Sequence, residues 1–276
     1  MSITAIPKIK YLTNKDLLRE IHNSKNTFCV FTQPEFSEYD LIVLDLEKIN
    51  ETSIADAKKI RAIKMAKAAH LKALETDKKA SLKNFEIDPN DVPKDQLIFR
   101  VMTYDHIPLA PGRKKTLKNV ADSHDKVNFP PFQHWKYTED GYLTCVGKSH
   151  WEGPINTGKF NKAKGQMTNN LARMFLKLCD RYATRGNVRG YTYNDEMKGQ
   201  AILQLTQIGL QFDESKSDNP FAYYTAAVTN SFVRIINIEK RNQNIRDDIL
   251  EINGMNPSWT RQNSGGAGGS SDGDVD

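Results

Sequence analysis

A stripe of polar and aromatic side chains between residues 219 and 241 has types and spacing suited to binding nucleic acid. The segment predicts one helix, with Asn219 as its N-cap and Pro220 at the first helical position. Alternating spacings of four and three place six residues on one side: Tyr223, Ala227, Asn230, Arg234, Asn237 and Arg241. Arginine binds phosphates or guanine edges, asparagine can pair with adenine, and tyrosine offers a ring to an unstacked base. The alternative interpretation is a solvated helix face.

Apolar stripes predict how this helix and the one two elements before it are held in place. The opposite side of the 219–241 helix carries Phe221, Val228, Phe232, Ile235 and Ile236, which we expect to be buried. A further helix is predicted over 169–186, ending before Gly186, because apolar residues recur there at helical spacing. These residues are Leu171, Met174, Phe175, Leu178, Cys179 and Tyr182.

Between these two helices a third is predicted, from Thr192 as its cap to about Gln211. Asp195, three residues after the cap, and Glu196 lie in its first turn, where the helix dipole favours acids. One side carries Leu203 surrounded by Glu196, Gln200, Gln204, Gln207 and Gln211. Amides on such a stripe would each need partners if buried, so the face is not a core. It is either a solvated surface or a protein docking face with an apolar anchor.

Charge is distributed unevenly along the chain of 276 residues. The net charge is only +5, but residues 159–246 contain 14 Lys/Arg against 7 Asp/Glu, which favours a polyanionic partner. No apolar run approaches the roughly 18–20 residues that a membrane span needs, and the N-terminus lacks a signal-peptide core. Three widely spaced cysteines, Cys29, Cys145 and Cys179, indicate reduced thiols. These features place the protein in a cytoplasm.

The first 155 residues predict a different organisation. A short helix is expected within 1–26, with Asn14 as its cap. Strands are expected at 27–32, 41–46 and 97–104, and a capping box of Ser53 and Asp56 opens a basic helix that ends near Glu75. Between residues 105 and 131 the prolines, Gly112 and the run 113–115 predict a segment dominated by loops. The Gly/Ser/Asp tail over 263–276 is expected to be disordered.

The three C-terminal helices together resemble conserved region two of bacterial sigma factors. They are more similar still to the late-transcription sigma factors of T-even-type bacteriophages and their cyanophage relatives. The segments that carry the resemblance are 169–186, 190–197 and 212–241, and residues 9–21 are similar to the start of the phage late factors. The resemblance covers roughly 40% of the chain.

The resemblance implies a function and its residues. The factor would bind the host RNA polymerase core and direct initiation at late promoters by recognising and opening an A/T-rich −10-like element, with no catalysis, metal or cofactor. Its docking on the coiled coil of the largest polymerase subunit maps onto Glu196, Gln200, Leu203 and Gln207. Promoter DNA binding maps onto Tyr223, Tyr224, Asn230, Arg234, Asn237, Lys240 and Arg241. A sliding clamp or a late co-activator is a further implied partner, no membrane is involved, and the location is the cytoplasm of the infected bacterial host.

Three departures from the family pattern qualify these expectations. Primary sigma factors carry a tryptophan pair where this chain has Ala226 and Ala227, so Tyr223 and Tyr224 are the aromatic residues left for melting. The clamp-binding tail motif of phage late factors is absent, since only Val275 is apolar among the last seven residues. No helix-turn-helix region for −35 elements follows.

The expected fold is therefore mainly α, with a helical region-two-like domain at 156–250 and a mixed α/β region before it. That region comprises an N-terminal helical segment, 1–26, and an insertion, 27–155, that has no counterpart in the shorter T-even protein. We expect the insertion to contact polymerase.

Two other functions remain open on sequence grounds. The same Arg/Tyr face would suit a sequence-tolerant single-stranded nucleic-acid-binding protein. A metal-dependent nuclease would use His134, Cys145 and His150 with Cys29 or His124, or Asp105 and His106, but no close ligand pair or second carboxylate cluster accompanies them. The basic helix presents a surface that is solvated, faces polymerase or touches nucleic acid; its cations are Lys58, Lys59, Arg61, Lys64 and Lys67.

Overall fold

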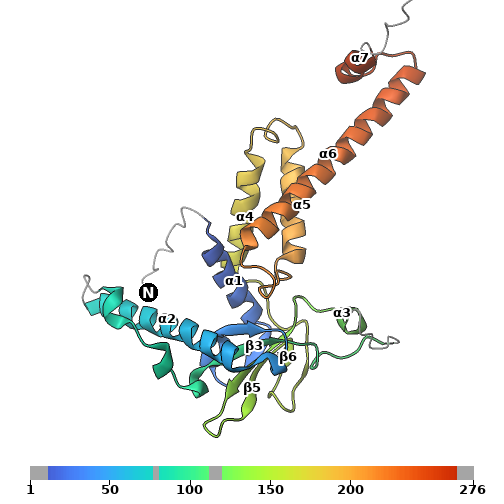
Figure 1. The fold of residues 1–276 in the computed structure, drawn as a ribbon. Coiled ribbons are helices and arrows are strands. Elements are labelled where there is room, and N and C mark those ends of the chain that lie inside the picture. Colours follow the sequence, from blue (N-terminus) through green and yellow to red (C-terminus); the bar gives the residue numbers. More distant parts are fainter. Residues whose placement is uncertain (1–11, 77–80, 112–119, 266–276) are drawn as a thin grey trace, which may run out of the picture. The chain divides into compact units, whose positions relative to one another are not determined.

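The computed structural model describes residues 12–76, 81–111 and 120–265, and these are mainly helical with one small mixed sheet (Figure 1). The basic run 113–115 and residues 266–276 of the expected tail lie outside these residues. Within them, no helix combines the length and apolarity that a bilayer crossing requires. The chain divides into two compact units, and the divisions fall inside helices. The N-terminal unit comprises Met1–Met174 with Ile208–Tyr223, and the helical unit comprises Phe175–Gln207 with Tyr224–Asp276.

Helix α1, Asn14–Asn26, opens the described part of the N-terminal unit and buries Leu17 and Ile21. Its cap is Thr13, one residue before the predicted one: the Thr13 hydroxyl accepts a hydrogen bond from the Asp16 N–H at 3.2 Å. Asn14 has a different partner, because its side-chain oxygen accepts from the Phe221 N–H at 3.0 Å. The prediction of Asn14 as the cap was therefore wrong by one residue.

The five-stranded sheet of this unit has the order β1-β5-β4-β3-β2. Strands β2 and β3 are parallel, and the other neighbours are antiparallel. The strands are β1 Cys29–Phe31, β2 Leu41–Val43, β3 Ile98–Met102, β4 Phe132–Tyr137 and β5 Leu143–Ser149. A separate two-stranded sheet pairs β6 Trp151–Glu152 with β7 Lys159–Phe160. Short elements connect these strands: η1 Pro34–Ser37, η2 Leu46–Lys48, η3 Leu82–Phe85, η4 Pro89–Asp91, η5 Lys94–Gln96 and α3 Val120–Ser123.

Strands β1, β2 and β3 confirm the three predicted strands, whereas β4 and β5, which follow the segment expected to be loop-dominated, were not predicted. Their buried positions explain why. In β4 the buried residues after Phe132 are Gln133 and His134, and a bulge follows at His134/Trp135. The alternation of apolar and polar residues that signals a half-buried strand is therefore missing.

Helix α2, Glu51–Thr76, contributes to a hydrophobic core that it shares with β2 and β3. Its cap is a reciprocal pair: the Asn50 side chain accepts from the Ser53 N–H, and the Ser53 hydroxyl accepts from the Asn50 N–H. The predicted pairing of Ser53 with Asp56 was therefore displaced by one turn. The core residues are Val43, Ile54, Ala57, Ala62, Val92, Leu97, Phe99 and Val101.

Several cations of α2 have partners within the N-terminal unit. Lys59 pairs with Asp56, and Arg61 and Lys64 both face the buried carboxylate of Asp40. Lys58 donates to the Asn90 carbonyl. These contacts favour a structural, solvated role for this basic helix face.

The helical unit is built on α4, Asn169–Ala183, α5, Asn194–Ile208, and α6, Pro220–Ile252. The predicted apolar stripe of α4 is buried along its whole length. Its rings meet those of α6 edge to face: Phe175 with Tyr224 and Tyr182 with Phe232, each with centroids 4.8 Å apart. Helix α5 begins at Asn194, two residues after the predicted cap, and ends three residues before Gln211.

Helix α6 is 33 residues long and extends well beyond the predicted end at residue 241. Asn219 caps it as predicted, since its side-chain oxygen accepts from the Ala222 N–H at 3.1 Å. Phe221, expected in the core, is 39% exposed, because the buried positions of the first turns are Pro220 and Tyr224. At the far end α7, Trp259–Gly265, follows a turn in which Ser258 bonds to the Asp247 carboxylate.

Candidate nucleic-acid interface

The structure places six of the seven residues predicted to bind DNA on the exposed surface of α6. They are Tyr223, Asn230, Arg234, Asn237, Lys240 and Arg241. Their exposure follows from the buried stripe on the other side of the helix, where Val228, Phe232 and Ile235 are almost completely covered. The helix therefore has one side in the core and one side available to a ligand, as its amphipathic pattern predicted.

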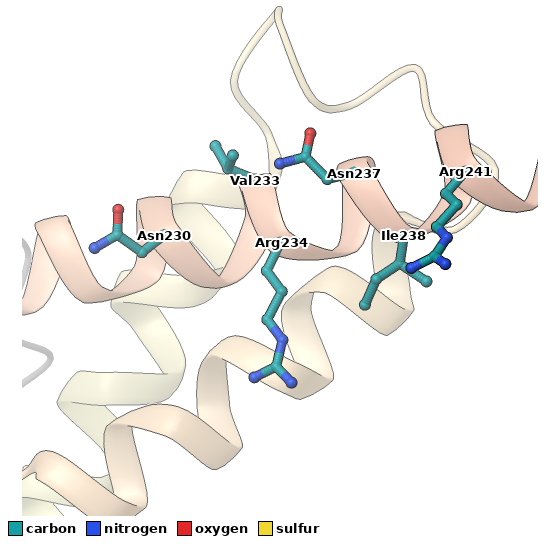
Figure 2. A pocket seen from close by; sticks show the side chains of 6 residues that line it. All are labelled: Asn230, Val233, Arg234, Asn237, Ile238 and Arg241. Carbon is teal, nitrogen blue, oxygen red and sulfur yellow. The ribbon is translucent and has the colours of Figure 1, made fainter.

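Four of these residues share a shallow depression of about 600 Å³ in the helical unit. Figure 2 shows Asn230 and Asn237 projecting from one side of the exposed face, while Arg234 and Arg241 project from the other. Two apolar side chains that the prediction omitted, Val233 and Ile238, complete the lining. They are 47% and 43% exposed, so they add accessible apolar surface to the depression.

The guanidinium groups of this depression are available for an external anion. Within the described residues, the side chains of Arg234 and Arg241 make no hydrogen bond or ion pair. Between residues 219 and 246 the sequence has a single acid, Glu239, against four cations. Arginine forks without an internal partner bind phosphate oxygens in two-bonded geometry, and the neighbouring amides can both donate to and accept from base edges. In this depression the arginines are therefore suited to the phosphates of a nucleic-acid strand, and the asparagines are suited to its bases.

Tyr224 does not belong to this surface. Its side chain is completely buried and packs edge to face on Phe175. The reason is its position, four residues before Val228, which continues the buried stripe toward the start of the helix. The prediction of Tyr224 as a DNA contact is therefore wrong for this conformation. Tyr223, at 37% exposure, is the partly exposed tyrosine of this helix, and burial raises its pKa.

The four residues predicted to contact polymerase lie on one exposed face of α5. Glu196, Gln200 and Gln207 are exposed around Leu203, which has 53% of its surface accessible. The opposite face buries Met197, Ala201 and Leu205. An exposed leucine ringed by flexible polar side chains has the make-up of a small protein-binding surface. This face and the α6 depression both belong to the helical unit.

A cluster of buried charges, centred on Arg100, was missed by the sequence analysis. The Arg100 guanidinium is fully buried between the rings of Tyr39 and Phe132, at 3.9 and 3.8 Å from their centroids. It donates to His134 Nε2 at 3.0 Å and to Glu214 Oε2 at 3.2 Å. The sequence did contain a clue to this cluster: Arg100 interrupts the apolar residues of strand β3. A cation buried in such a strand requires an acidic or polar partner.

Lys25 extends the Arg100 cluster from α1. Its ammonium donates to the Phe212 carbonyl at 2.7 Å and to the same Glu214 oxygen at 3.1 Å. Burial lowers the pKa of Lys25, although the nearby Glu214 carboxylate opposes this effect. The segment 212–214, which leads into α6, is thereby fixed to α1 and to the sheet. This also positions Tyr223, whose ring meets the edge of the Phe212 ring at 5.5 Å.

Two histidines of the Arg100 cluster are held neutral. Burial and the Arg100 charge lower the pKa of His22 to about 3 and that of His134 well below its ordinary value. His134 has both ring nitrogens engaged, because Nδ1 donates to the Phe36 carbonyl at 2.6 Å and Nε2 accepts from Arg100. It therefore has no lone pair left for a metal in this arrangement.

Cys29 and His106, which were also considered for metal or hydrolytic chemistry, are held in partly or fully buried surroundings. Within residues 12–76, 81–111 and 120–265, no three His, Cys, Asp or Glu side chains are grouped so that they could hold a metal ion. All three cysteines are free thiols. Burial raises the pKa of Cys29 to about 12, so its thiol stays protonated. His106 donates from Nε2 to the Ser149 carbonyl and accepts from Gln133 at Nδ1, and burial lowers its pKa to about 4.

Comparison with protein-family models, curated proteins and solved structures gave no match for this chain. The candidate interface is therefore defined by its own residues and geometry.

Proposed function

We propose that this protein is a phage-encoded sigma factor that binds the host RNA polymerase core and directs initiation at late promoters. The observation that carries the proposal is the α6 depression, where two unpaired arginines stand beside two asparagines on an otherwise amphipathic helix. The resemblance of residues 169–241 to sigma region two supports the same assignment. The proposed location is the cytoplasm of the infected bacterium.

In this function α6 binds the −10-like element. Arg234 and Arg241 neutralise phosphates, while Asn230 and Asn237 contact base edges. Opening the duplex costs a few kcal/mol for each extruded base. Stacking on an aromatic ring recovers about 1–3 kcal/mol per base. Stacking on Tyr223 can therefore offset the cost of extruding about one base, because Ala226 and Ala227 offer no ring. The remaining stabilisation comes from phosphate contacts and from polymerase.

Polymerase binding is assigned to α5. Leu203 enters an apolar site on the coiled coil of the largest subunit, and Glu196, Gln200 and Gln207 form the polar rim around it. Because α6 binds DNA and α5 binds polymerase, the protein by itself binds a promoter weakly. Core polymerase supplies the remaining DNA contacts.

A second candidate function is supported by the same unpaired arginines and by the exposed ring of Tyr223. A sequence-tolerant single-strand binder would also use cations and an aromatic surface. It differs from a sigma factor in one property: its affinity for DNA does not depend on polymerase.

Fluorescence anisotropy with a labelled A/T-rich promoter fork tests the proposal directly. The sigma assignment predicts weak binding by the protein alone and at least a tenfold increase in affinity when core polymerase is added. Arg234→Ala should remove most of that increase, while Arg173→Ala, an exposed arginine on α4, should not. Equal, tight binding with and without polymerase would support the single-strand binder and overturn the sigma assignment.

A further inference from the structure

The loop between α4 and α5 carries a second group of cations in the helical unit. Arg181 in the last turn of α4, Arg185 and Arg189 are all exposed and follow one another at intervals of four residues. No acidic residue lies between Asp180 and Asp195. This stretch was not part of the predicted site.

Two tyrosines accompany these arginines. The rings of Tyr191 and Tyr193 lie 5.1 Å apart at an angle of 35°, and both are only half-buried. Arg185 lies over the Tyr182 ring, with its guanidinium carbon 4.3 Å from the centroid. Cations interleaved with accessible rings are the combination that proteins use to follow a nucleic-acid strand.

Hydrogen bonds hold the loop in one conformation. The N–H groups of Val188 and Arg189 both donate to the Arg185 carbonyl, at 3.0 and 2.9 Å. Asn194 closes the loop from the other end, because its amide donates to the Ala183 and Val188 carbonyls. Val188 is buried beneath these turns. A loop fixed in this way presents its side chains at a lower entropic cost of binding.

The loop also lies near the middle of α6. Tyr182, at the end of α4, contacts Phe232, and the pKa of Tyr193 is raised by burial, then by Tyr191 and by Glu239 of α6. Glu239 lies between Asn237 and Arg241 in sequence.

We propose that the α4–α5 loop is a second nucleic-acid contact, in which Arg185 and Arg189 bind phosphates of the strand that occupies the α6 depression. The proposal rests on the assignment of α6 to DNA. An acidic protein surface would also attract two arginines, but the accessible tyrosine pair and the neighbouring α6 cations favour a nucleic-acid strand. The contact carries no sequence information, because phosphates are the same at every base.

The test uses the full-length protein with core polymerase and the labelled promoter fork, titrated at several salt concentrations. The double variant Arg185→Ala/Arg189→Ala should bind about tenfold more weakly, and the slope of log affinity against log salt should fall by about two contacts, at roughly 0.7–0.9 each. Arg185→Lys/Arg189→Lys should retain most of the affinity. The control Arg173→Ala/Lys177→Ala removes two exposed charges from α4 and should change neither quantity.

Arg189→Ala alone keeps the proposal testable if loss of the Arg185–Tyr182 contact unfolds the loop, and about half of the effect is expected from it. An unchanged affinity and salt slope in the folded variants would overturn the proposal. So would a loss of polymerase binding in place of DNA binding, which would identify an acidic protein surface as the partner. Parallel titration of Arg234→Ala/Arg241→Ala separates the assignment of α6 from that of the loop. If this variant loses DNA affinity and the loop variants do not, only the proposed loop contact is rejected. Loop-dependent DNA binding without initiation rejects the sigma assignment alone.

Discussion

At the scale of single residues, the Arg100 cluster depends on one buried acidic side chain. One carboxylate, Glu214, faces two buried cations, Arg100 and Lys25. Glu214→Gln keeps the shape of the side chain but leaves both cations without a counter-charge. Removing one partner from a buried ion pair costs about 3–5 kcal/mol, so we expect the free energy of unfolding in urea to fall by that amount. Asp218→Asn, at an exposed position nearby, should change it by less than about 0.5 kcal/mol, and an equally small change for Glu214→Gln would contradict the cluster's structural role.

Three histidines in buried or partly buried positions predict a specific pH dependence of stability. The pKa values of His22 and His150 are lowered to about 3 and that of His106 to about 4, against an unfolded value of 6.5. Below pH 6.5 the unfolded chain binds protons that the folded chain does not, so stability falls as pH decreases from 6.5 toward 4. The expected slope is roughly 1 kcal/mol per pH unit for each histidine. Urea unfolding at pH 7.5, 6.0 and 5.0 measures it, and equal stability at the three pH values would show that these histidines are not buried.

Tyr223 and Tyr224 are adjacent in sequence but should behave differently when truncated. Tyr224→Ala empties a core position against Phe175 and should lower the free energy of unfolding by about 3–5 kcal/mol. Tyr223→Ala should have little effect on unfolding but should weaken binding to a fork that contains an unpaired base. Thermal unfolding and fork anisotropy of the two variants make the comparison. Weaker fork binding for Tyr224→Ala with unchanged unfolding would instead identify Tyr224 as a DNA contact.

At the scale of the secondary-structure elements, α5 offers a matched pair of leucines. Leu203 is exposed and Leu205 is fully buried, two residues apart on the same helix. Leu205→Ala should cost about 2–5 kcal/mol of stability. Leu203→Ala should leave stability nearly unchanged and weaken the affinity for core polymerase by about tenfold, measured by pull-down or anisotropy. Unchanged polymerase affinity for Leu203→Ala would remove α5 as the docking face.

The predictability of each element depended on how its buried side is composed. Helices α4 and α6 were predictable because their buried residues are apolar and recur at helical spacing. Strands β4 and β5 were not, since positions such as Gln133 and His134 are polar and buried through hydrogen bonds that the sequence does not reveal. The caps of α1 and α2 were each misplaced because several hydroxyl and amide side chains stand near both starts, and only the folded chain selects among them.

At the scale of the whole molecule, the sequence predicted the exposed faces of α5 and α6 but not the cluster that fixes the segment before α6. Glu214 is separated from Arg100 by 114 residues and from Lys25 by 189, so no local pattern could join them. The α4–α5 loop was overlooked for another reason: Arg185 and Arg189 lie between the two helices and outside their apolar stripes. The Arg100 cluster therefore depends on contacts that are distant in sequence, whereas the α4–α5 loop is held by local hydrogen bonds.

The central claim is that this chain, added to core polymerase, starts transcription at A/T-rich late promoters through α6. Run-off transcription with purified core polymerase tests it most directly, using the wild type, Asn230→Ala and Arg234→Ala. We predict a discrete run-off product with the wild type and a strongly reduced product with each variant, at unchanged polymerase binding. Absence of initiation by the wild type would contradict the claim, and full activity of both variants would show that the DNA-binding face lies elsewhere.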